Sequence, residues 1–129
     1  MRVSSLLLVC TGNICRSPMA EALFRHALRD QPQIRVASAG IGAPVGAPAD
    51  PQAQTLMLER KLDLAAHRAQ QLTLDEVRQF ELLLVMEQRQ KDWILQRFPL
   101  ARGRVYELGQ WRDMEIPDPY QGSMTDFRQ

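Results

Sequence analysis

The sequence has few of the features that would assign it to a class by composition alone. Only two of its 129 residues are cysteine, Cys10 and Cys15, and they stand close together. So few cysteines do not fit a disulfide-stapled secreted scaffold, and they predict free thiols in a reducing compartment such as the cytosol. The net charge is only +1. That balance argues against nucleic-acid binding and against a polybasic membrane patch, so an anion would have to be bound locally.

Long apolar runs are also missing. The longest, residues 6–10 and 82–86, have five residues each, far below the ~18 that suggest a membrane-spanning helix. A single Arg2 before the first run falls short of a secretory signal, so we expect a cytoplasmic location and no membrane insertion. The chain has the composition of a globular protein, with 45% hydrophobic and 24% charged residues. Its length predicts one domain over residues 1–129.

Short β-prone runs alternate along the chain with segments of helical period. Strands are predicted at residues 4–9, 34–38, 81–86 and 104–108. Helices are predicted after the N-cap residues Ser17, Asp50 and Thr73, the second reaching about Lys61, and over residues 89–98. This alternation indicates an α/β fold with a parallel sheet. Such sheets bind ligands at the carboxyl ends of their strands, which is where Cys10 falls.

Residues 10–17, which we call the 10–17 loop, have the composition of an anion site. They read Cys-Thr-Gly-Asn-Ile-Cys-Arg-Ser and lie between a predicted strand and a predicted helix. A turn with a glycine and Asn13 before a helix N-terminus makes a nest of backbone N–H groups that suits an oxyanion. A thiolate at Cys10 would be stabilised there as a nucleophile. Arg16 could hold two phosphoryl oxygens, and Ser17 could donate its hydroxyl to the sulfur.

A plainer interpretation of the 10–17 loop is a buried cysteine that ends a strand, with a surface arginine following it by chance. The Gly-Lys-Ser/Thr ending of nucleotide P-loops is absent, so no nucleotide site is predicted. Two cysteines and two histidines at these spacings match no zinc pattern. We therefore expect no metal and no cofactor.

Two segments resemble a known family. Residues 9–21, Val-Cys-Thr-Gly-Asn-Ile-Cys-Arg-Ser-Pro-Met-Ala-Glu, resemble the signature of the low-molecular-weight protein-tyrosine phosphatases, and residues 116–120, Ile-Pro-Asp-Pro-Tyr, resemble their general-acid loop. Segments 41–46, 86–87 and 109–111 look most like the bacterial branch encoded with capsule and exopolysaccharide genes. The resemblance implies a three-layer α/β sandwich like phosphotyrosine protein phosphatase I. In that fold a four-stranded parallel sheet of order 2-1-3-4 is flanked by helices.

The resemblance also implies an activity, the hydrolysis of phosphotyrosine through a cysteinyl-phosphate. Cys10 would be the nucleophile, Arg16 the phosphate clamp, and Asp118 the general acid and then the base. The other residues implied to bind phosphate or substrate are Thr11, Gly12, Asn13, Ile14, Cys15, Ser17 and Tyr120. A network of Asn13, Ser17, Ser38 and His67 would fix the loop, with Asn13 in a left-handed conformation. The implied substrate is the tyrosine-rich tail of an autophosphorylated membrane tyrosine kinase, with phosphate or a similar oxyanion bound in the site.

Some positions leave alternatives open. Cys15 could trap an oxidised Cys10 as a disulfide or could simply fill space. Many relatives have an aromatic wall after residues 38–40, and here Ile41 or Val45 would replace it with an aliphatic one. Glu87 stands where many members have aspartate.

The C-terminus is a further departure from the family pattern. The chain ends nine residues after Tyr120, where the family usually continues into a helix that covers one face of the sheet. We therefore expect a domain in which this C-terminal helix is truncated, or in which the face of the sheet is buried in another way, for example by dimerisation. Such a domain should be less stable than an extended version and should self-associate at high concentration.

Two other functions would suit the same fold. An arsenate reductase would need further redox cysteines, and the sequence has none after Cys15. A non-catalytic phospho-binding module would need the nest but neither Cys10 nor Asp118. The presence of both residues favours a phosphatase.

Overall fold

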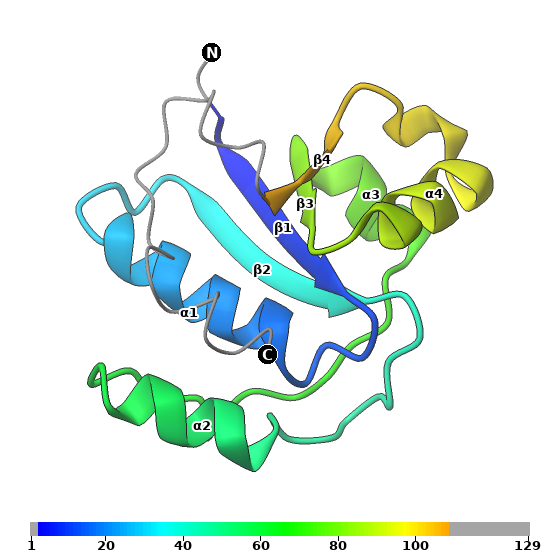
Figure 1. The fold of residues 1–129 in the computed structure, drawn as a ribbon. Coiled ribbons are helices and arrows are strands. Elements are labelled where there is room, and N and C mark those ends of the chain that lie inside the picture. Colours follow the sequence, from blue (N-terminus) through cyan, green and yellow to red (C-terminus); the bar gives the residue numbers. More distant parts are fainter. Residues whose placement is uncertain (1–2, 109–129) are drawn as a thin grey trace.

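Four parallel strands form the middle layer of the fold, in the order β2-β1-β3-β4. They are seen in a computed structural model, in which residues 3–108 are described (Figure 1). The strands are β1 (Ser5–Cys10), β2 (Arg35–Gly40), β3 (Leu82–Val85) and β4 (Val105–Glu107). The predicted parallel sheet and its strand order are confirmed.

Helices cover both faces of this sheet. They are α1 (Arg16–Ala27), α2 (Pro51–Leu58), α3 (Leu74–Gln79) and α4 (Gln88–Arg97), with a 3₁₀ turn at Pro99–Ala101. Figure 1 shows α1 and α2 on one side of the sheet and α3 and α4 on the other. The result is the three-layer sandwich that the family resemblance implied.

The central strand β1 is buried on both faces, which explains its unbroken apolar sequence. Leu6 and Leu8 pack into the core beneath α1, whereas Leu7 and Val9 pack into the core beneath α3 and α4. Each of these side chains is at most 1% exposed, and full burial of such a side chain contributes ~1.5–3 kcal/mol. Cys10, the last residue of β1, therefore ends a strand that is buried along its whole length.

Two predicted helix starts are confirmed. The carboxylate of Asp50 accepts from the backbone N–H of Gln52 at 2.8 Å, which caps α2. Thr73 and Glu76 form the predicted capping box at the start of α3. In both cases a short polar side chain satisfies a backbone N–H that the first helical turn leaves without a partner.

The helix α2 ends at Leu58, earlier than predicted. Beyond it, Lys61 turns the chain with a φ of 62°, and the N–H of Leu62 donates to the carbonyl of Met57 at 2.8 Å. A left-handed residue that closes a helix in this way is usually glycine, so a lysine at this position does not mark a helix end in the sequence.

The predicted N-cap of α1 is wrong. Cys15, not Ser17, is the N-cap residue, and it makes no side-chain cap hydrogen bond. Ser17 lies inside the first turn, where its hydroxyl contacts the sulfur of Cys10 and the amide of Asn13. The hydroxyl cannot cap the helix because these two groups occupy it.

Some predictions concern parts of the chain outside the described residues. Asp118 and Tyr120 are among them, and so is the segment on which the expectation of a shortened C-terminus rests. Within residues 3–108, no helix is both long and apolar enough to cross a membrane.

Candidate active site

The sulfur of Cys10 lies at the carboxyl end of β1 and receives two polar contacts. The backbone N–H of Asn13 donates to it at 3.2 Å, and the hydroxyl oxygen of Ser17 lies 2.9 Å away. The cysteine is only 3% exposed. Hydrogen bonds of this kind stabilise the thiolate more than the thiol, so the arrangement favours a nucleophilic sulfur.

Asn13 is the residue around which the 10–17 loop is built. It has a φ of 55°, the left-handed conformation that the family resemblance implied and that asparagine tolerates better than most residues. Its side-chain amide donates to the hydroxyls of Ser17 at 2.8 Å and Ser38 at 3.0 Å. Its side-chain oxygen accepts from the N–H of Gln70 at 2.9 Å, and its carbonyl lies 2.7 Å from Nε2 of His67. These contacts hold a fully buried polar residue in an unusual backbone conformation.

The network fixes the direction of its own protons. Because the amide oxygen of Asn13 accepts a backbone N–H, its nitrogen must face the two serines as donor. The oxygen of Ser17 is thus an acceptor toward Asn13, which frees its own proton for the sulfur of Cys10. Ser38 is an acceptor in the same way and donates to the carboxylate of Glu21 at 2.5 Å.

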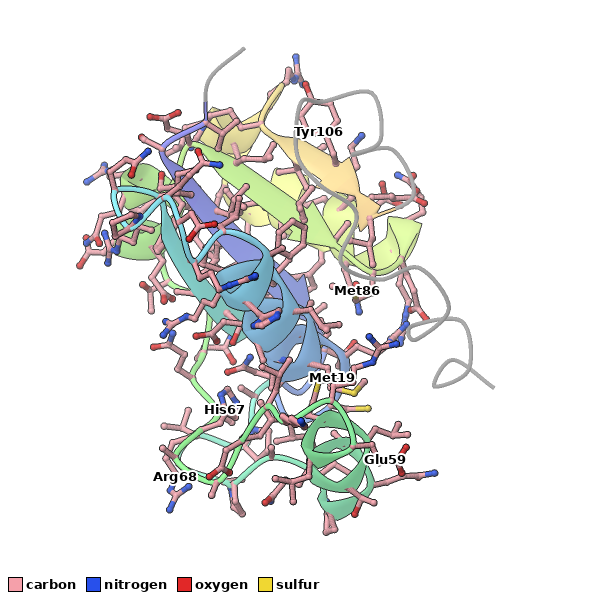
Figure 2. The ribbon with its side chains drawn as sticks, turned by 90° about the vertical axis from the view of Figure 1, so that its left-hand side faces the viewer. Met19, Glu59, His67, Arg68, Met86 and Tyr106 are labelled. Carbon is pink, nitrogen blue, oxygen red and sulfur yellow. The ribbon has the colours of Figure 1, made fainter. Side chains whose placement is uncertain are left out.

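His67 lies on the connection between α2 and α3, alongside α1 (Figure 2). The carbonyl of Asn13 can only accept, so Nε2 of His67 carries a proton. Gln70, on the same connection, donates its side-chain amide to the carbonyl of Ser38 at 2.6 Å. The sequence did not single out Gln70 or Glu21 as site residues.

Arg16 stands in the first turn of α1 with its side chain 20% exposed, and it contacts Glu87 from the loop after β3 at 3.4 Å. The other carboxylate oxygen of Glu87 accepts from Nε of Arg89 at 2.6 Å. The bond from Arg89, assisted by the charge of Arg16, lowers the pKa of Glu87 below its ordinary value. Glu87 therefore stays ionised and holds the Arg16 guanidinium beside the loop.

Cys15 differs from Cys10 in its surroundings, although both are free thiols. Burial raises the pKa of Cys15 to about 12, and the negative charges of Asp50 and Cys10 add to the effect, against a lowering by Arg16. Cys15 is therefore a thiol at neutral pH and is not itself activated as a nucleophile.

The remaining predicted residues of the 10–17 loop lie in its outer turn. The hydroxyl of Thr11 accepts from the side-chain amide of Gln90 at 3.2 Å, a contact that the sequence did not suggest. A β-carbon at Gly12 would lie 3.5 Å from the side chain of Ile14, so Ile14 packs against that glycine.

Two residues after β2 were candidates for an aliphatic wall of the site. Ile41 packs against the core, whereas the side chain of Val45 is 73% exposed.

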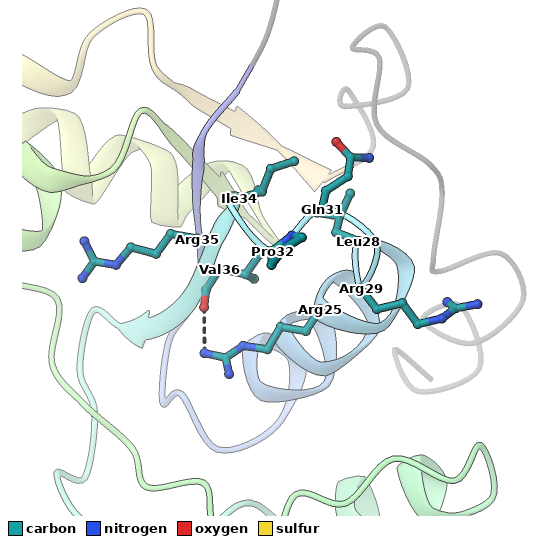
Figure 3. Close-up of a pocket in the computed structure, with 8 residues that line it drawn as sticks. All are labelled: Arg25, Leu28, Arg29, Gln31, Pro32, Ile34, Arg35 and Val36. Carbon is teal, nitrogen blue, oxygen red and sulfur yellow. Dashed lines mark hydrogen bonds between the residues drawn. The ribbon is translucent and has the colours of Figure 1, made fainter.

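A hollow of about 310 Å³ lies near the other end of α1, away from Cys10 (Figure 3). Arg25, on its wall, is already bonded to the carbonyl of Val36 at 2.8 Å and to Glu21 at 2.7 Å. The side chains of Arg29 and Arg35 point away from this hollow in opposite directions. The arginine side chains around the hollow do not point toward a common position inside it. We therefore do not assign it as an anion site, and the 10–17 loop is the candidate.

Comparisons with known proteins agree with this geometry. The family described as low molecular weight phosphotyrosine protein phosphatase matches residues 5–129. EpsP of Ralstonia nicotianae, a probable low-molecular-weight protein-tyrosine phosphatase, is 46% identical over 98% of this chain and 86% of its own. The crystal structure of the tyrosine phosphatase Wzb from Escherichia coli K30, in complex with sulphate, is 42% identical with a TM-score of 0.80. It covers 98% of this chain and 87% of that chain.

This chain is also similar to an enzyme of known structure that has a different activity. The arginine phosphatase YwlE from Geobacillus stearothermophilus is 34% identical, with a TM-score of 0.81 over 97% of this chain and 81% of that chain. The same fold is thus shared by a tyrosine phosphatase and an arginine phosphatase.

Proposed function

We propose which residues perform the reaction in this chain, which belongs to the low-molecular-weight phosphotyrosine protein phosphatase family and is a protein-tyrosine phosphatase. Cys10 is the nucleophile, Arg16 the phosphate clamp and Asp118 the acid and base. The observation that carries the proposal is the sulfur of Cys10, which receives the Asn13 N–H and the Ser17 hydroxyl at the carboxyl end of β1.

In the first step the Cys10 thiolate attacks phosphorus, a sulfur–phosphorus bond forms, and the bond from phosphorus to the tyrosine oxygen breaks. Asp118 gives its proton to the departing phenolate, whose conjugate acid has a pKa near ~10. A positioned acid of this kind contributes roughly 10²–10⁴-fold. Arg16 and the backbone N–H groups of the 10–17 loop stabilise the charge on the equatorial oxygens.

In the second step water attacks the cysteinyl-phosphate and gives its proton to Asp118, now a carboxylate. Inorganic phosphate leaves, and Cys10 departs from phosphorus as a thiolate. The hydroxyl of Ser17, whose proton is directed toward the sulfur by the bond from Asn13, stabilises that leaving thiolate. This two-step path does not call for a metal ion, so EDTA should leave the rate unchanged.

We propose that the physiological substrate is the tyrosine-rich tail of a bacterial tyrosine kinase that regulates exopolysaccharide synthesis. The support is the resemblance to the capsule-linked branch and the similarity to EpsP. Such a tail lies in the cytoplasm, so the enzyme is proposed to be cytoplasmic. Tyr120 would line the mouth of the site and contact the substrate ring. Oxyanion binding is supported by sulphate in the structure of Wzb.

A peptide series tests the proposed substrate class. The chain should hydrolyse a phosphotyrosine peptide and should act far more slowly on peptides of the same sequence with phosphoarginine or phosphoserine. Preference for phosphoarginine would instead place the chain functionally with the arginine phosphatases.

A substitution tests the role of Asp118. Asp118→Ala should slow aryl phosphates with poor leaving groups far more than activated ones, because only the former need the proton. An equal loss for both kinds of substrate would contradict acid catalysis by Asp118.

A further inference from the structure

Five polar side chains are fully or almost fully buried within residues 3–108: Ser5, Asn13, Ser17, Ser38 and Gln90. Three of them form the network behind Cys10. Gln90, in the first turn of α4, is 0% exposed and belongs to the opposite side of the sheet from α1. A buried amide costs stability unless its polar atoms are bonded, so the partners of Gln90 indicate what it does.

The amide of Gln90 makes three hydrogen bonds. Its oxygen accepts from the backbone N–H groups of Met86 and Glu87, each at 2.9 Å, and its nitrogen donates to the hydroxyl oxygen of Thr11 at 3.2 Å. Two backbone donors cannot face an NH₂ group, so the amide can have only this orientation. A side chain that both accepts and donates is therefore required at this position.

These bonds join the ends of two neighbouring strands. Thr11 directly follows Cys10 at the end of β1, whereas Met86 and Glu87 follow β3, which pairs with β1 in parallel. Figure 2 shows Met86 at this end of the strands. The Asn13 network ties the 10–17 loop to the β2 side, and Gln90 ties the same loop to the β3 side.

Gln90 also bonds Glu87, the residue whose side chain contacts the proposed phosphate clamp Arg16. The bond is to the backbone of Glu87, and the side chain of Glu87 contacts Arg16 at 3.4 Å. One amide thus spans the loop that carries the nucleophile and the loop that holds the partner of the clamp. A displacement of either loop by about 1 Å can cost on the order of 10²-fold in rate.

We propose that Gln90 is a positioning residue for the phosphatase reaction, which sets the 10–17 loop and Glu87 relative to each other through Thr11. The inference rests on the proposed function of Cys10 and Arg16 and adds a residue that touches neither substrate nor sulfur. Substitution of a positioning residue should lower the rate of turnover per active site. Substitution of a residue that only stabilises the fold would instead lower the fraction of molecules that have a folded active site.

The test is the neutral, nearly isosteric substitution Gln90→Met, with Gln88→Met as the matched control. Gln88 lies two residues earlier on α4, is exposed and bonds Asp92 at 2.9 Å. Turnover of p-nitrophenyl phosphate per active site, counted by the burst of product, should fall about tenfold in Gln90→Met, as expected for lost buried hydrogen bonds. KM should change less than kcat, and Gln88→Met should match the wild type.

A double-mutant cycle with Thr11→Val separates positioning from general stability. If Gln90 acts through Thr11, Gln90→Met should cost clearly less in the Thr11→Val background than in the wild type. Thr11→Ser, which keeps the hydroxyl, should restore the full effect. Should Gln90→Met fail to give a cooperative melt, Gln90→Asn, too short to span both loops, takes its place in the cycle.

Two results would overturn the inference: wild-type turnover per active site in Gln90→Met, or an equal cost of that substitution with and without the Thr11 hydroxyl. Failure of the proposed function looks different. In that case the wild-type chain itself would not turn over phosphotyrosine.

Discussion

Gly40, the last residue of β2, stands directly behind the carbonyl of Thr11 in the 10–17 loop. A β-carbon at Gly40 would lie 2.6 Å from that carbonyl oxygen and 3.0 Å from the backbone nitrogen of Asn13. These neighbours are backbone atoms of a loop that is fixed on both sides, so they cannot move aside without displacing the anion site. The glycine is therefore required by space, at the point where β2 meets the loop.

Gly40→Ala should thus lower kcat by on the order of 10²-fold through displacement of the 10–17 loop, and it should destabilise the fold by ~1–3 kcal/mol through overpacking. Gly42→Ala is the matched control, because a β-carbon there would meet nothing within 4 Å. Kinetics with an aryl phosphate and urea melts of both variants measure the two effects. Wild-type turnover in Gly40→Ala would mean that the loop adjusts freely.

Glu87 divides its two carboxylate oxygens between Arg16 and Arg89. Glu87→Gln should tighten the binding of phosphate severalfold, because it removes a negative charge beside the clamp, and should lower kcat because Arg16 loses its support. Arg89→Gln should weaken phosphate binding, since Glu87 then pairs with Arg16 alone. Both shifts in the inhibition constant should shrink at high salt, which screens exposed pairs. A shift of the same sign in both variants would contradict this account.

The raised pKa of Cys15 predicts how the thiol responds to oxidation. With the pKa at about 12, the reactive thiolate of Cys15 is a minute fraction at neutral pH and grows about tenfold per pH unit. If Cys15 captures an oxidised Cys10, recovery of peroxide-treated enzyme by thiol reductant should be poor near pH 7 and improve with rising pH. The Cys15→Ser variant should show no such improvement. Equal recovery in both proteins at every pH would assign Cys15 to packing alone.

The left-handed Lys61 after α2 offers a test of stability that is independent of the site. Lys61→Gly should stabilise the fold by about 0.5–1 kcal/mol, because glycine adopts a positive φ without steric cost. The neighbouring Arg60, which is not among the left-handed residues of the described chain, provides the control: Arg60→Gly should destabilise. Urea midpoints would decide, and a lower midpoint for Lys61→Gly would contradict the prediction.

Much of this molecule could be predicted from local sequence. The apolar runs predicted the four strands, and Asp50 and Thr73 marked helix starts, because these signals act over a few residues. The N-cap of α1 was mispredicted for the opposite reason. Whether Ser17 caps a helix depends on the folded shape of the 10–17 loop, which brings the sulfur of Cys10 and the amide of Asn13, seven and four residues earlier, to its hydroxyl.

The partners of the 10–17 loop could not be predicted from residue spacing alone. Gln90 meets Thr11 across 79 positions, and Glu87 meets Arg16 across 71. Such contacts arise only when β1 and β3 pair, and nothing in the local sequence of α4 marks a glutamine as buried. The family resemblance predicted Ser38 and His67 as residues of the network. The roles of Glu21, Gln70 and Gln90 were identified only from their contacts in the structure.

Cys10 is proposed to carry the phosphoryl group from the substrate to water. The enzyme can be quenched with acid during turnover of an aryl phosphate and the phosphate located by peptide mass spectrometry. We expect one phosphoryl group on the peptide that contains Cys10, on that cysteine and not on Cys15. We also expect that Cys10→Ser abolishes turnover but that the variant still binds orthovanadate. Rapid turnover without a phosphorylated Cys10, or substantial activity in Cys10→Ser, would contradict the proposal.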